Sequence, residues 1–285
     1  MKYKKYDLNY YYFFIFKFSL LIIIIIILMI IYIILFLSNE KISIIIPTYN
    51  REKLIIQSLK NILNQTYHNF EAIVIDDGST DNTEKAIYKL KDKRIRYIKL
   101  RKNKGSCIAR NIGIKKATGK YITFQDSDDL LHFDKLQKQL NNLIKHKSDF
   151  DFCKFCIHYN SKFKKIFPEQ KQEKNILNKN ILNELCNGNF ITTQSILVKK
   201  SYIEKFLFDP KFPRLQDYDL VLRIIPYIKI SYTNEVLVDL YRQKDSISRS
   251  LNKYKEAFRL LFKKKYNIKC NKKSKFYNIF KSKIL

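Results

Sequence analysis

The chain opens with a long run of apolar side chains. Every residue from 20 to 37 is apolar, and Phe and Ile residues precede this run at positions 13 to 16. A helix of this length spans nearly the roughly 30 Å hydrocarbon core of a bilayer. A signal peptide has a shorter apolar part, about 7 to 15 residues, followed by a cleavage site of small residues. The pattern therefore predicts a transmembrane helix in residues 1–40 and a single-pass membrane protein.

The next hundred residues alternate between short apolar runs and helical periodicities. Four runs suit strands that are buried on both faces, at residues 42–46, 70–75, 95–100 and 121–124. Three segments between them carry apolar side chains at helical spacing, at residues 53–63, 83–90 and 108–117. Alternating strands and helices predict an α/β domain with a doubly wound, mostly parallel sheet and helices on both faces.

The pattern is weaker in the second half. It predicts strands near residues 152–159 and 194–198 and helices near 175–185 and 218–225. We expect one domain over residues 41–250, with a nucleotide-sugar half (41–148) and an acceptor half (149–250).

A basic tail covers residues 251–285, where Glu256 is the one acidic residue. Two interpretations of this tail stay open. It forms a solvated amphipathic helix with a frayed end, or it contacts anionic lipid headgroups. Lysines on both sides of the apolar run leave undetermined on which side of the membrane the domain lies.

Composition adds less than the pattern does. A net charge of +29 beside 46% hydrophobic residues excludes wholesale disorder. Lys, Asn, Ile, Tyr and Phe are abundant and Trp is absent, as biased nucleotide composition would produce, so the charge is weak evidence for function. The five cysteines form no disulfide scaffold. Cys153 and Cys156 would face opposite sides of a strand, and the four histidines show no metal-ligand spacing.

Carboxylates cluster directly after two of the predicted strands. Asp76 and Asp77 precede Gly78, and the fourth strand is followed by Asp126, Asp128 and Asp129. Ligands of doubly wound sheets bind at the carboxyl ends of strands. Three carboxylates in four residues repel one another, and a hard divalent cation bridging to phosphate would relieve this repulsion. The alternatives are a turn after the second strand and a solvated helix N-cap after the fourth.

Five ordered motifs resemble the family 2 glycosyltransferases of the GT-A fold. They begin with Ser-Ile-Ile-Ile-Pro-Thr-Tyr-Asn-Arg at 43–51, Ile-Asp-Asp-Gly-Ser-Thr-Asp at 75–81 and Ala-Arg-Asn-Ile-Gly at 109–113. Gly-Lys-Tyr-Ile at 119–122 and Asp-Ser-Asp-Asp at 126–129 follow. A weaker resemblance continues through residues 214–220 and 241–242.

The resemblance implies a donor site for a nucleotide-diphosphate sugar, with a UDP-sugar as the expected donor. Pro47, Tyr49 and Asp77 would hold the base, by stacking and by accepting a hydrogen bond. Arg110 would bind the diphosphate bidentately. Asp126 and Asp128 would form a Mn²⁺ or Mg²⁺ site, where Asp128 is the expected ligand and Asp126 its partner.

The resemblance further implies an inverting reaction with a carboxylate base. The family places this acid near the start of a late helix, which here indicates Asp217, with Asp219 as the second choice. Either carboxylate could instead only cap that helix. Arg242 is expected to neutralise phosphate, whereas Lys244 stands where relatives often carry His.

The predicted function is transfer of a single sugar, because the signature of processive synthases is absent. The acceptor would be a glycan or a lipid-linked molecule, with membrane lipids nearby. One alternative is transfer onto a polyprenyl phosphate. A different class, motivated by the charge, is a non-catalytic basic protein that binds membranes or nucleic acid. No nucleic-acid partner is expected, since the acidic motifs persist in a Lys-rich chain.

Overall fold

The computed structural model describes residues 8–37, 40–160, 163–177, 181–242, 251–264 and 266. The chain divides into two compact units, Met1–Glu40 and Lys41–Leu285. The predicted position of Lys244 lies outside the described residues, as does most of the predicted tail.

The first unit consists of helix α1, Leu8–Leu37. Its side chains from Ile15 to Ile30 are exposed. In the part of the chain that the structure describes, no helix combines the length and the apolarity that crossing a membrane requires. The predicted transmembrane helix is therefore not supported.

The first half of the second unit is a parallel sheet with the predicted alternation. Its strands are β1 (Ile42–Thr48), β2 (Phe70–Asp76), β3 (Ile95–Lys99) and β4 (Tyr121–Phe124), in the order β3-β2-β1-β4. The intervening helices are α2 (Glu52–Leu63), α3 (Thr83–Tyr88) and α4 (Ser106–Lys116). Strands β1, β2 and β4 are almost wholly buried, as their continuous apolar runs predict. The bounds of these strands and helices are confirmed within two residues at each end. The expected burial of 95–100 on both faces is wrong, because β3 is the edge strand and is only half-buried.

The second half extends the sheet with strands that run in both directions. Strand β8 (Ile196–Lys199) pairs antiparallel with β4, and β6 (Phe150–His158) pairs antiparallel with β8. Strand β9 (Ile230–Tyr241) runs parallel to β6, while β5 (Leu130–Leu131) and β7 (Lys164–Phe167) pair antiparallel with β9 and β6. The sheet is thus mixed: the expected parallel pairing holds for β1 to β4 and for β6 with β9, while β5, β7 and β8 pair antiparallel. Antiparallel strands need no crossover helix, so the alternation rule fails for these strands.

The remaining helices belong mostly to the second half. They are α5 (Lys135–Lys145), α6 (Gln170–Leu177), α7 (Ile181–Leu185), α8 (Lys200–Phe206), α9 (Gln216–Ile224) and α10 (Leu251–Lys263). The helix predicted near 175–185 corresponds to the end of α6 and to α7, and residues 178–180 between them lie outside the described residues. The helix predicted at 218–225 is confirmed as α9.

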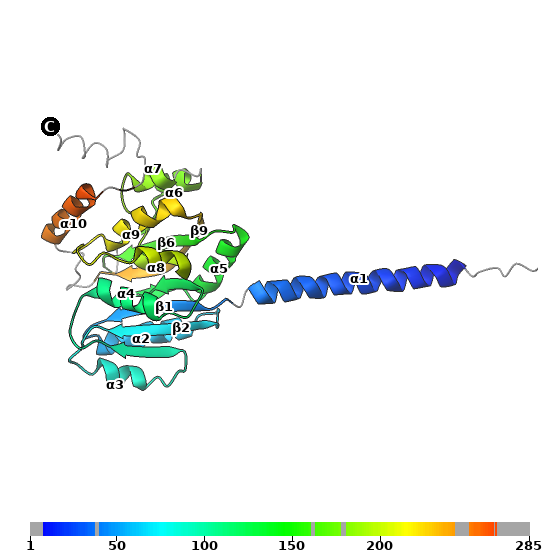
Figure 1. Cartoon of the computed structure of the whole chain (residues 1–285), viewed down its shortest axis with the longest axis horizontal. Helices are drawn as coiled ribbons and strands as arrows, with labels where there is room; N and C mark the ends of the chain where they lie inside the picture. Colours follow the sequence, from blue (N-terminus) through cyan, green and yellow to red (C-terminus); the bar gives the residue numbers. More distant parts are fainter. Residues whose placement is uncertain are drawn as a thin grey trace, which may run out of the picture. The chain divides into compact units, whose positions relative to one another are not determined.

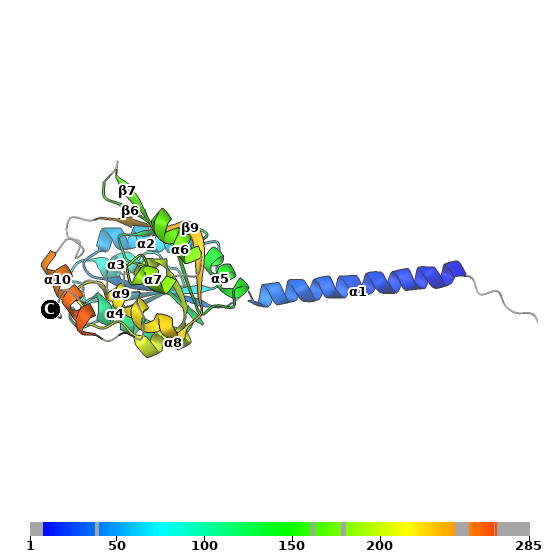
Figure 2. The ribbon, with the colours of Figure 1, turned by 90° about the horizontal axis from the view of Figure 1, so that it is seen from above.

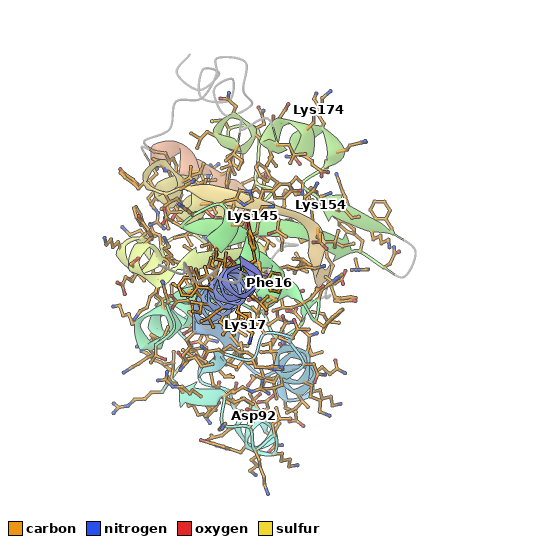
Figure 3. All side chains as sticks on the ribbon, turned by 90° about the vertical axis from the view of Figure 1, so that its right-hand side faces the viewer. Phe16, Lys17, Asp92, Lys145, Lys154 and Lys174 are labelled. Carbon is orange, nitrogen blue, oxygen red and sulfur yellow. The ribbon has the colours of Figure 1, made fainter. Side chains whose placement is uncertain are left out.

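Helices cover both faces of the sheet (Figure 1), as predicted. Figure 2 shows α2 and α3 on one side and α4 and α8 on the other. Helix α10 joins the second group, because Ala257 and Leu261 are fully buried in the same apolar cluster as α4 and α9. Part of the predicted basic tail is therefore packed into the core. Asp92, before β3, and Lys174, on α6, lie at opposite ends of the domain (Figure 3).

Candidate active site

A cavity of about 1170 Å³ opens where strands β1, β2 and β4 end. Seven of the eight side chains predicted for the site line it: Pro47, Tyr49, Asp77, Arg110, Asp126, Asp128 and Asp217. The eighth, Arg242, is not among the described lining residues, and its guanidinium lies 4.7 Å from the ring centre of Tyr159. The sheet edge thus brings together residues that are far apart in the sequence, as expected for the carboxyl ends of parallel strands.

Asp77 lines the cavity and is hydrogen-bonded to the loop before α4. Its Oδ1 accepts a hydrogen bond from the backbone N–H of Lys104 at 2.8 Å, and its Oδ2 accepts one from that of Gly105 at 2.7 Å. The next residue, Gly78, has φ +82°, and a Cβ there would lie 2.9 Å from the backbone carbon of Lys102. Only glycine fits this turn. Each Asp77 oxygen keeps a second lone pair for a ligand.

Arg110 and Asp126 form the charged centre of the cavity. The Nη2 of Arg110 donates to Oδ1 of Asp126 at 2.7 Å, and Nη1 donates to Oε1 of Gln216 at 3.3 Å. Arg110 is 6% exposed and its Nε has no hydrogen-bond partner. Burial alone would lower the pKa of this guanidinium, but the charge and hydrogen bond of Asp126, together with smaller contributions from Cys107 and Asp217, raise the pKa. Arg110 therefore stays positively charged, and its Nε–H is available to donate a hydrogen bond to a ligand.

The acidic loop after β4 carries more negative charge than its neighbours compensate. Oδ2 of Asp126 and Oδ2 of Asp129 both accept hydrogen bonds from Nε2 of Gln194 at 2.7 Å. Burial and the charges of Asp126 and Asp128 raise the pKa of Asp129 well above its ordinary value. Asp128 is only partly buried and faces the cavity. This cluster of hard oxygen donors fits a divalent cation, with Asp128 as the accessible ligand.

The two candidate bases on α9 lie in different surroundings. Asp217 lines the cavity, and its Oδ1 accepts a hydrogen bond from the N–H of Tyr218 at 2.8 Å. Burial raises the pKa of Asp217, while this bond and the charge of Arg110 oppose the rise. Asp219 is fully buried, accepts a hydrogen bond from Arg223 and forms ion pairs with Arg223 and Lys264. The structure therefore gives access to a substrate at Asp217 and not at Asp219.

Three further residues of the cavity escaped the sequence analysis. Gln194 links two of the clustered carboxylates, although nothing in its sequence context marks it. Arg214 lines the cavity with its guanidinium 5.1 Å from the ring centre of Tyr254, and Tyr254 comes from α10. The motif at 214–220 marked Arg214 only as part of a resemblance, without a role. The sequence analysis could not place Tyr254 in the cavity, because its position depends on how α10 packs.

Comparison with solved structures defines the class of protein. The structure is similar to that of S. aureus TarS in complex with UDP-GlcNAc, with a TM-score of 0.66 over 80% of this chain and 68% of that chain. The identity is 22%, so the likeness is one of fold. With its α/β sheet and cavity, the chain has a GT-A-like fold.

Comparison of sequences identifies the family. Residues 43–207 match glycosyl transferase family 2. An uncharacterised glycosyltransferase of Haemophilus influenzae is 35% identical over 78% of this chain and 88% of its own length. The Escherichia coli UDP-Glc:alpha-D-GlcNAc-diphosphoundecaprenol beta-1,3-glucosyltransferase WfgD is also 35% identical, over 76% of this chain and 83% of its length. The chain belongs to glycosyl transferase family 2 and is a glycosyltransferase.

Proposed function

We propose that the enzyme transfers one hexose from a UDP-sugar to a lipid-linked saccharide, with inversion and with the help of a divalent cation. The observation that carries this proposal is that Asp77, Arg110, Asp128 and Asp217 line one cavity. Together they offer a base-binding carboxylate, a cation for the diphosphate, a metal ligand and a candidate general base.

The proposed chemistry uses Asp217 as the proton acceptor. As the acceptor hydroxyl attacks the anomeric carbon, its proton moves to the Asp217 carboxylate, and the bond from this carbon to the diphosphate breaks. Arg110 holds the departing diphosphate on the opposite face of the sugar, and Arg214 adds a second positive charge. A cation bound by Asp128, Mn²⁺ or Mg²⁺, would supply Lewis-acid stabilisation of that leaving group.

The acceptor class is proposed from the relatives and from α1. WfgD acts on a diphosphoundecaprenol-linked sugar by its name, and it matches this chain over most of both lengths. The exposed apolar side chains of α1 from Ile15 to Ile30 support contact between the enzyme and lipid. We therefore propose a location at a membrane, beside an acceptor that is itself anchored there.

The donor and cation proposals are tested by Asp128→Asn. We expect this variant to bind UDP in the presence of Mn²⁺ about tenfold more weakly or worse, because it removes one negative charge from the cation site while it keeps the side-chain shape. Isothermal titration calorimetry measures this loss. Asp92→Asn, just before β3 and not among the described residues that line the cavity, should bind UDP like the wild type. Equal UDP affinity of the wild type in Mn²⁺ and in EDTA would contradict the cation proposal.

The membrane proposal is tested by deleting α1. A truncated protein that begins at Ser38 keeps the whole compact unit Lys41–Leu285. We expect it to hydrolyse a UDP-sugar at the wild-type rate but to lose at least about tenfold in transfer to an acceptor held in liposomes, because deletion removes the lipid contact. Co-flotation with liposomes measures binding directly. Equal transfer by both proteins in liposomes would remove α1 from the reaction.

A further inference from the structure

Three side chains with metal-binding atoms converge on the face of β6 opposite the cavity. Cys156 and His158 lie two residues apart on β6, so they share one face of this strand. Asp239 on β9 is the register partner of Cys156, and His132, which follows β5, contacts Asp239. The alternate residues Phe155 and Ile157 point the other way and line the cavity. The cluster is therefore separate from the donor site.

The ligand atoms of the cluster already lie close together. One atom each of Cys156, His158 and Asp239 lies within 4.8 Å of the other two. Nε2 of His158 is 2.7 Å from Oδ1 of Asp239, and Nε2 of His132 is 2.9 Å from Oδ2. Ligand atoms around a tetrahedral zinc lie roughly 3.3 to 3.7 Å apart, as bonds of 2.0 to 2.3 Å require. An ion fits among Cys156, His158 and Asp239 after the imidazole of His158 and the carboxylate separate by less than about 1 Å.

The chemistry of these side chains is that of a zinc site. Thiolate, imidazole and carboxylate are the three ligand types that Zn²⁺ takes in proteins. Cysteine binds the ion as a thiolate, because a coordinating thiol is deprotonated outright.

We propose that Cys156, His158 and Asp239 bind one Zn²⁺ ion that ties together strands β6 and β9, and that His132, hydrogen-bonded to Oδ2 of Asp239, orients this carboxylate and links β5 to the site. The site would stabilise the acidic loop Asp126–Asp129, because β5 begins directly after Asp129. The link continues through Tyr241, whose ring stacks on His158 at 4.7 Å and whose N–H donates to Oδ1 of Asp129 at 3.1 Å. The ion therefore helps to fix the position of Asp129, in the same loop that carries Asp126 and Asp128.

The test titrates the metal-stripped full-length protein with Co²⁺, which replaces Zn²⁺ and shows a near-ultraviolet absorption band when a thiolate binds it. We expect one equivalent of Co²⁺ to give this band and Zn²⁺ to displace it. Cys156→Ser should lose the band and bind Zn²⁺ at least about tenfold more weakly. His158→Gln should keep a thiolate band while its Zn²⁺ affinity falls by a similar factor.

Two control variants establish whether the band comes from Cys156. Cys153→Ser changes a buried thiol of the same strand that packs in the apolar cluster with Phe155, so it should keep the band. Asp128→Asn should also keep it, because that carboxylate belongs to the cavity. A wild-type protein without the band, or a Cys156→Ser variant that retains it, would overturn the proposal. A melting temperature that rises with Zn²⁺ in wild type and not in Cys156→Ser would support it independently.

Discussion

Asp217→Asn is expected to lower the transfer rate by about a hundredfold or more while UDP binding stays at the wild-type level. General-base catalysis typically contributes about this factor, and an amide cannot accept the proton of the acceptor hydroxyl. The substitution keeps the size of the side chain at the start of α9. Steady-state transfer kinetics and calorimetry with UDP, on the same preparations, measure the two effects separately.

The pH profile provides a second readout for Asp217. A base works only when it is deprotonated, so transfer should fall as the pH drops through the pKa of Asp217. Burial raises this pKa, so the acidic limb of kcat/KM should lie above the ordinary range of an aspartate. The limb should disappear in Asp217→Asn. A variant that transfers at nearly the wild-type rate, with the limb intact, would show that another group is the base.

Asp219→Asn is expected to cost about 3 kcal/mol of unfolding free energy. The carboxylate is fully buried and holds Arg223 at 2.8 Å and Lys264 at 2.8 Å, and Tyr266 donates a hydrogen bond to it at 2.9 Å. Removing one partner of a buried ion pair typically costs about 3 to 5 kcal/mol, because the other charge is left uncompensated. We expect the lower end, since Arg223 and Lys264 keep some contact with solvent. Urea unfolding measures the change.

The matched control for this effect is Asp209→Asn. Asp209 pairs with the same Lys264 at 3.0 Å, but both side chains are more than a quarter exposed. Exposed pairs contribute about 0 to 1 kcal/mol, so the control should unfold close to the wild type. Asp217→Asn should also unfold close to the wild type. If Asp219→Asn were equally stable but inactive in transfer, the assignment of the two carboxylates of α9 would be reversed.

The parallel half of the fold was predictable because its signals are local. Each buried strand is a continuous apolar run, and each helix between two strands has its own periodicity. The turns at Asp77-Gly78 and Asp126–Asp129 follow strands directly, so the sheet edge that gathers them is implied by the order of elements alone. The same reason explains why seven of the eight predicted site residues line one cavity.

The second half was harder because its elements are defined by their partners. Strand β9 is the longest of the sheet, yet its alternation is interrupted where the register with β6 shifts at Cys153 to Phe155. The position of Tyr254 in the cavity likewise depends on the packing of α10 through Ala257 and Leu261. Neither feature leaves a periodic signal in its own segment.

The sequence by itself determined the α/β class, the donor-site motifs and the family resemblance, because these depend on residues that are adjacent or at short regular spacings. Tertiary structure alone shows how Asp217 and Asp219 differ: both lie on one helix, but one lines the cavity and the other is buried against Arg223 and Lys264. It alone also brings Cys156, His158 and Asp239 together. Strand pairing joins residues about eighty positions apart, and no spacing along the chain encodes that contact.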